Sequence, residues 1–155
     1  MTLADFITPE AVLPSLNAAD KKQLLAALST RASELCGLEE RDIFDVLLQR
    51  ERLGSTGVGQ GVAIPHGKIP GLTRIVGLFA RLAEPIDFDA IDEEPVAIVV
   101  LLLAPEGAGA DHLKALARIS RLLRDRASVQ KLRSSDDAET LYAVLTQDDM
   151  ASHAA

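Results

Sequence analysis

The sequence lacks the features that mark several large classes of protein. It contains one cysteine, Cys36, in 155 residues, so no intramolecular disulfide can form, and its apolar helical surroundings favour a small core residue over a reactive thiol. The longest apolar run, residues 96–104, is much shorter than the roughly 20 residues that cross a bilayer. The first ten residues have neither the basic start nor the apolar stretch of a signal peptide. We therefore expect a cytoplasmic protein that is not embedded in a membrane.

An excess of positive charge is also missing. The chain has 16 lysines and arginines against 23 acidic residues, a formal net charge of −7. Because proteins bind nucleic-acid backbones mainly through surplus lysine and arginine, this balance argues against a nonspecific nucleic-acid binder and leaves room for one local phosphate site. With 48% hydrophobic residues and no internal repeat, the chain is expected to be one domain over residues 1–155, with a core at about 5–145 and a flexible tail at 147–155.

Hydrophobic periodicity predicts helices on both sides of the chain's centre. One helix is expected between the capping segment 17–20 and Gly37, and a second over residues 39–52, which begins with acidic residues and ends with arginines. A third is expected over residues 111–126, and a last one from a capping box at Asp136. The predicted inner stripe of the third helix consists of Leu113, Leu116, Ala117, Ser120 and Leu123.

Strand patterns occupy the middle of the chain. Residues 62–64 and 74–82 are rich in β-branched and aromatic residues, and an acidic loop at 87–94 follows. Residues 96–103 are apolar on both faces, which is typical of a central strand covered on two sides. The order of helices, strands and helices predicts a single α/β sandwich with helices on both faces of the sheet.

The segment 54–68, GSTGVGQGVAIPHGK, holds five of the chain's ten glycines. In the Walker A pattern GxxxxGK[ST], Gly54 and Gly59 would have the right spacing, but Gln60 and Gly61 stand in place of the lysine and the hydroxyl residue. The dinucleotide pattern GxGxxG is not matched either. Both motifs also need a strand before and a helix after, whereas here a helix is expected before and a strand after. The standard nucleotide-binding loops are therefore excluded.

Two histidines are candidates for chemistry. Pro65 holds the chain extended before His66, and Gly67 is expected to let it turn afterwards. His66 is therefore expected at the end of a strand, in a segment whose backbone has little conformational freedom. His112 stands near the start of the helix after the central strand, where open α/β sheets commonly bind anions. Each has a plain structural alternative: a turn residue for His66, and a solvated first-turn residue for His112.

Potential phosphate ligands precede His66 in the sequence. They comprise two hydroxyl side chains, the backbone N–H groups of the glycine run and one arginine of the preceding helix. The residues are Ser55, Thr56, Gly57, Gly59 and Arg50. Together they predict an anion-binding nest that faces the imidazole.

Three segments together resemble a known family, the fructose/mannitol-type IIA proteins (EIIA type 2) of the phosphoenolpyruvate phosphotransferase system (PTS). They are GSTGVGQGVAIPHGK, EPIDFDAIDEEPVAIVVLLLAP and DHLKALARIS. The sequence QRERLGSTGVGQGVAIPHGK, together with DFDAID, is most similar to the nitrogen-regulatory branch of this family. The resemblance implies a mixed sheet of about five strands flanked by helices. It also implies phosphorylation of His66, a phosphoryl contact from His112 and charge stabilisation by Arg50, with Thr56 in the same motif.

The implied activity is that of a phosphocarrier. A neutral imidazole is nucleophilic at neutral pH and can take a phosphoryl group from another phosphohistidine, so the protein's task is positioning and charge stabilisation. The expected donor is an HPr-like phosphocarrier protein, and the expected targets are regulated proteins such as a sensor kinase or an ion transporter. Neither a metal nor a cofactor is required.

Three alternatives remain at this point. One is a sugar-transport IIA component that passes phosphate to a IIB domain, and another is a binding module that uses the surface around His66 without phosphorylation. The third is a metal-dependent hydrolase built from His66, His112 and the acidic loop at 87–94. Against it stands the absence of HxxxH, HxH or any other close ligand spacing.

Overall fold

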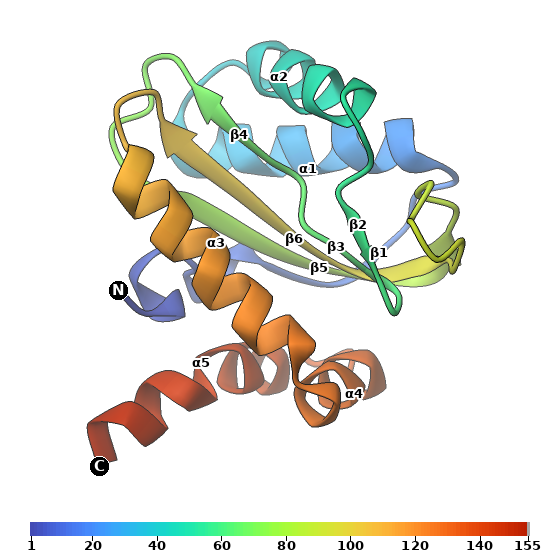
Figure 1. Cartoon of the computed structure of the whole chain (residues 1–155), viewed down its shortest axis with the longest axis vertical. Helices are drawn as coiled ribbons and strands as arrows, with labels where there is room; N and C mark the ends of the chain where they lie inside the picture. The colour runs from blue at the N-terminus through green and yellow to red at the C-terminus, as the bar shows by residue number, and fades with distance from the viewer. Residues whose placement is uncertain (155) are drawn as a thin grey trace.

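A mixed sheet is built around β6 (Val96–Pro105), the strand that the sequence predicts to be central (Figure 1). In this computed structural model, which describes residues 1–154 and the side chains up to Gln147, the six strands have the order β1-β5-β6-β3-β2, and β4 also pairs with β6. The other strands are β1 (Val12–Leu16), β2 (Gly57–Gly59), β3 (Val62–Ala63), β4 (His66–Ile69) and β5 (Val76–Ile86). The predicted α/β sandwich with a mixed sheet is confirmed, with one strand more than the resemblance implied.

Helices cover both faces of this sheet (Figure 1). On one face lie α1 (Lys21–Cys36) and α2 (Glu40–Arg52). On the other lie α3 (Gly109–Arg124), α4 (Arg126–Ser134) and α5 (Ala138–Ala154). Two short 3-10 helices, η1 (Leu3–Asp5) and η2 (Pro9–Ala11), precede β1.

Alternation along β6 divides the interior into two cores. Ile98, Val100 and Leu102 belong to the cluster that includes the buried side chains of α3, α4 and α5. The residues between them point to the opposite face, and Val99 and Leu101 belong to the cluster formed with α1 and α2. Burial on both faces explains why this strand reads as an uninterrupted apolar run.

The limits of α1 follow from its two capping residues. Asp20 accepts a hydrogen bond from the backbone N–H of Gln23 through its side chain (2.8 Å), and Gly37 ends the helix with a φ of 78°. Cys36, the last residue of the helix, is half-buried and packs against the core beneath α1, which agrees with the structural role predicted for it.

The C-terminal helices differ from the prediction. The helix expected over residues 111–126 is α3, which ends at Arg124, and the separate helix α4 that follows the extended Asp125 was not predicted. The last helix is capped by Asp137 rather than Asp136, since the Asp137 carboxylate accepts a hydrogen bond from the backbone N–H of Thr140 (2.9 Å). The predicted flexible tail at 147–155 lies outside the described side chains, apart from Gln147, and stays a prediction.

The predicted inner stripe of α3 was right for Leu123 and wrong for most of its other members. The buried residues of this helix are His112, Ala115, Ile119, Leu122 and Leu123, whereas Leu113 is 68% exposed. The leucines of this helix are compatible with two inward-facing stripes that differ by one position. A stripe chosen only to contain apolar residues leaves out His112. The true register turns His112 inward, toward the sheet.

The helices of the described chain do not include a membrane span. Within residues 1–154, none of them combines the length and the apolar character that crossing a bilayer requires.

Candidate functional site

His66 is positioned by an interruption in one edge of the sheet. β3 and β4 both pair in parallel with β6 in the same register. Between them Ile64 and Pro65 belong to neither strand, and the carbonyl of Pro65 accepts a hydrogen bond from Leu102 N (3.0 Å). His66 therefore begins β4, opposite Leu102, instead of ending a strand as the sequence predicted. Gly67 continues β4, so the predicted turn at this glycine was also wrong.

Gly67 is required by packing. A Cβ placed there would lie 2.6 Å from Cγ1 of Val46 in α2. The missing side chain lets α2 lie close against β4, and α2 carries Arg50 to the edge where His66 stands.

We expect Gly67→Ala to disturb this contact. The added methyl group forces Val46 or the whole of α2 outward, at a cost of about 1–3 kcal/mol in the free energy of unfolding, measured in urea. The matched control is the double variant Gly67→Ala/Val46→Ala, which removes the opposing methyl groups and should cost less than the sum of the two single substitutions. Additive effects, or a single variant as stable as the wild type, would contradict the packing argument.

The tautomer of His66 is set by its own backbone. Its Nδ1 lies 2.8 Å from the carbonyl oxygen of Ile64. Because a carbonyl oxygen only accepts hydrogen bonds, Nδ1 carries the proton in the neutral ring, and Nε2 keeps its lone pair. The half-buried ring thus presents one nucleophilic nitrogen.

His112 faces His66 from the first turn of α3. The two ring centroids are 5.9 Å apart, and the rings are tilted by 59°. His112 is only 9% exposed, which excludes the solvated first-turn alternative, and its Nε2 is buried without a hydrogen-bond partner among the described residues. An unpartnered buried polar atom beside a nucleophilic nitrogen indicates a place for a bound polar group.

An open hollow of about 680 Å³ surrounds the two histidines. Three cationic side chains contribute to its wall: Arg50, Arg52 and Lys68. Arg50 is anchored, since its Nη1 donates a hydrogen bond to the carbonyl oxygen of Gly54 (2.8 Å). In a chain with a net charge of −7, this is a local concentration of positive charge suited to an anion.

Two of these cations, Arg52 and Lys68, were missed by sequence reasoning. Lys68 had a usable signal, because residues two apart in a strand point to the same face, so it follows His66 on the same side of β4. Arg52 had a weaker one, its place beside Arg50 in the last turn of α2.

The predicted hydroxyl ligands do not line this hollow. Ser55 donates a hydrogen bond to the carbonyl oxygen of Phe88 (2.7 Å) and accepts one from Gly57 N (3.0 Å). Thr56 is buried, and both its hydroxyl and its backbone N–H donate to the carboxylate of Glu51. Their polar groups are thus engaged within the fold.

The glycines ahead of His66 form a hairpin rather than an anion nest. Gly57 and Gly59 belong to β2, which pairs antiparallel with β3. The two connecting residues, Gln60 and Gly61, have φ of 59° and 79°, the combination of a type I′ turn. The structure therefore brings Arg50, His66 and His112 together and leaves Ser55, Thr56, Gly57 and Gly59 outside the hollow.

The environment of His112 makes a pH dependence of stability measurable. Burial, followed by the positive charges of His66 and Lys68, lowers the pKa of His112 below its usual 6.5. Below about pH 6.5 the unfolded chain binds a proton at this ring that the folded chain does not yet bind, so the wild type loses stability as the pH falls.

We expect His112→Asn to remove this part of the pH dependence. Urea unfolding at about pH 7.5 and about pH 5.5 should show a smaller loss of stability for the variant than for the wild type. Equal losses in the two proteins would contradict the lowered pKa.

The described residues do not form a metal-binding site around His66 and His112. Within the described residues, no group of three or more His, Cys, Asp or Glu side chains is arranged to hold a metal ion. The acidic loop therefore does not join His66 and His112 in a ligand set.

An α/β protein with an imidazole beside an open hollow lined by cationic side chains has the groups that binding an anion requires. Residues 5–148 match the family described as phosphoenolpyruvate-dependent sugar phosphotransferase system, EIIA 2, and the chain belongs to this family. Members are phosphotransferase components that accept phosphate from phosphocarrier proteins and pass it on.

Individual relatives agree with this assignment. The chain is 61% identical to a nitrogen regulatory protein of Bradyrhizobium diazoefficiens over 94% of its own length and 95% of the relative's. It is 36% identical to a fructose-specific EIIA component of Haloferax volcanii, with 83% and 84% covered. The crystal structure of nitrogen regulatory protein IIA-Ntr from Neisseria meningitidis superimposes with a TM-score of 0.88 at 34% identity, over 93% of this chain and 99% of that one. The nitrogen-regulatory type of IIA protein fits the chain best.

Proposed function

We propose that the protein accepts a phosphoryl group on Nε2 of His66 from an HPr-like phosphocarrier protein and regulates target proteins by its phosphorylation state. The observation that carries the proposal is the His66 ring, held through Nδ1, with its centroid 5.9 Å from that of His112, whose Nε2 is buried without a partner among the described residues. In the transfer, the P–N bond of the donor histidine breaks as the bond from phosphorus to His66 Nε2 forms. The proton on His66 Nδ1 stays in its hydrogen bond with Ile64, so the ring needs no external base.

The neighbouring groups have separate tasks in this step. His112, kept neutral by its lowered pKa, donates from Nε2–H to a phosphoryl oxygen, which satisfies a donor that is otherwise buried without a partner. Arg50 and Lys68 offset the negative charge of the phosphoryl group from the wall of the hollow. Ser55, Thr56, Gly57 and Gly59 support the site through the hairpin and its attachment to α2.

The rim of the hollow favours a protein as the donor. Leu53, which lines it, is 85% exposed, and Leu113, next to His112, is 68% exposed. Large exposed apolar side chains beside an open cationic site are typical of protein docking surfaces. A phosphohistidine protein that buries these two leucines would bring its phosphoryl group to His66.

The regulatory role rests on similarity to nitrogen regulatory proteins, and the candidate targets are a sensor kinase or an ion transporter in the cytoplasm. The second candidate is a sugar-transport IIA component, which is favoured by the similarity to a fructose-specific EIIA protein. The two are separated by presenting the phosphorylated protein to a fructose-type IIB domain. Rapid loss of the phosphoryl group to IIB would select the transport role, and retention would select the regulatory one.

We expect His112→Ala to slow phosphoryl uptake without unfolding the protein. Loss of one preorganised donor to the phosphoryl group lowers the transfer rate by about 100-fold, measured by quenched time courses with a phosphorylated HPr-like donor. Circular dichroism serves as the folding control. Unaltered kinetics in a folded variant would remove His112 from the site.

A further inference from the structure

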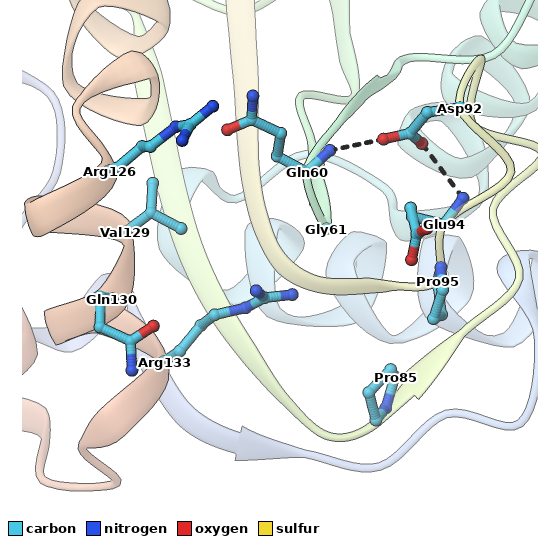
Figure 2. A pocket seen from close by; sticks show the side chains of 10 residues that line it. All are labelled: Gln60, Gly61, Pro85, Asp92, Glu94, Pro95, Arg126, Val129, Gln130 and Arg133. Atoms are coloured by element: carbon cyan, nitrogen blue, oxygen red, sulfur yellow. Dashed lines mark hydrogen bonds between the residues drawn. The ribbon is translucent and has the colours of Figure 1, made fainter.

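A second cavity, of about 420 Å³, lies between the β2–β3 turn and α4 (Figure 2). It shares no lining residue with the hollow around His66. One wall is formed by side chains of α4, and the opposite wall by the turn residues Gln60 and Gly61 and by the end of the acidic loop before β6. Its volume falls in the range of small-molecule sites.

Three charged side chains of this cavity form no ion pair within the described part of the chain. Arg126 and Arg133, one on each side of Val129 in α4, both line it, and Glu94 lines the opposite wall. Within the described residues no salt bridge engages Arg126, Arg133 or Glu94, and Asp92 adds a second negative charge to the wall.

Asp92, the other acidic residue of the cavity, is already engaged. One carboxylate oxygen accepts a hydrogen bond from Gln60 N (2.9 Å) and the other accepts one from Glu94 N (3.1 Å). Both backbone bonds lower the pKa of Asp92, and the bond from Gln60 ties the acidic loop to the β2–β3 turn. Asp92 therefore shapes the wall, and Glu94 is the acid left for a ligand.

Arg133 packs against the β2–β3 turn. Its guanidinium lies against Gly61, where a Cβ would overlap Nη2, and its backbone carbonyl accepts a hydrogen bond from Arg81 Nε (3.0 Å). Glycine at 61 satisfies both the positive φ of the turn and this close approach. Glycine at 61 therefore leaves room for the Arg133 guanidinium at the wall of the cavity, where its planar N–H groups can bind a carboxylate.

We infer that the cavity binds a free acidic α-amino acid, whose two carboxylates pair with Arg126 and Arg133 and whose ammonium group pairs with Glu94. A ligand with two negative charges and one positive charge complements the unpaired charges of the walls. The side-chain amides of Gln60 and Gln130 line the same cavity and supply further hydrogen bonds. This site does not depend on the phosphocarrier proposal.

The test is a titration of the ¹⁵N-labelled full chain with L-glutamate, followed by NMR. We expect saturable shifts of the Gln60, Gly61 and Gln130 signals. L-Glutamine lacks the second carboxylate and glutarate lacks the ammonium group, so each should bind about tenfold more weakly or worse. Absence of saturable shifts at these residues, or equal affinity for all three compounds, would overturn the proposal.

Substitutions at the charged residues of the cavity test which of them bind the ligand. Arg126→Gln and Glu94→Gln should each weaken glutamate binding by about tenfold. The control is Lys131→Gln, which makes the same charge change as Arg126→Gln on an exposed residue of α4 outside the cavity. It should bind like the wild type, and a folded Arg126→Gln that also binds like the wild type would refute the site. His66→Ala should retain glutamate binding, so the outcome here is independent of the outcome for phosphoryl transfer.

Discussion

Replacing His66 with alanine is expected to abolish phosphoryl uptake completely. In our account His66 Nε2 is the atom that bonds to phosphorus, and the other imidazole of the site has a buried Nε2 that acts as a donor. Incubation with a phosphorylated HPr-like protein, followed by intact-mass measurement, should show one phosphoryl group on the wild type and none on His66→Ala.

Two controls make this experiment specific. The phosphoryl group on the wild type should be labile in acid and stable in alkali, as for phosphohistidine, and His112→Ala should still become phosphorylated, only more slowly. Full labelling of folded His66→Ala would place the acceptor elsewhere and refute the assignment.

The second large effect is expected at Glu51, which joins three segments next to the site. Its carboxylate is 3% exposed, lies 2.8 Å from Lys21 Nζ at the start of α1, and accepts hydrogen bonds from the backbone N–H and the hydroxyl of Thr56. Lys21 Nζ in turn lies 4.5 Å from the centre of the Phe88 ring. Removing one member of a buried ion pair leaves the others without compensation.

We expect Glu51→Ala to lower the free energy of unfolding by about 3 kcal/mol, measured in urea. The matched control is Asp45→Ala, an exposed acidic residue of the same helix, which should change stability by no more than about 0.5 kcal/mol. Glu51→Gln should fall between the wild type and Glu51→Ala, because it keeps acceptors for Thr56 and loses the charge. A Glu51→Ala protein as stable as Asp45→Ala would show that the cluster does not hold these segments.

Local signals in the sequence predicted the structure correctly where a single physical cause determines it. Asp20 and Gly37 set the limits of α1, and the uninterrupted apolar run of β6 predicted its central position. The meeting of His66 and His112 was also predictable, because a residue after a central strand and a residue on a neighbouring strand reach the same edge of a parallel sheet.

Apart from Arg52 and Lys68, the features that sequence reasoning missed depend on tertiary contacts. The role of Gly67 is set by Val46, which lies 21 positions earlier, and Thr56 turns away from the hollow because Glu51 provides its partner. The inward direction of His112 contradicts simple apolar counting, since the ring faces a polar site and not the core. Sites of this kind are where local rules are expected to fail.

The most direct test of the account is the position of the phosphoryl group on the ring. Long-range NMR correlation of ¹⁵N and ³¹P in the phosphorylated wild-type protein reports which nitrogen is bonded to phosphorus. We predict a single phosphoryl group on Nε2 of His66, with Nδ1 still protonated and hydrogen-bonded to Ile64. Phosphorus on Nδ1 of His66, on His112, or on no histidine at all would contradict the central claim.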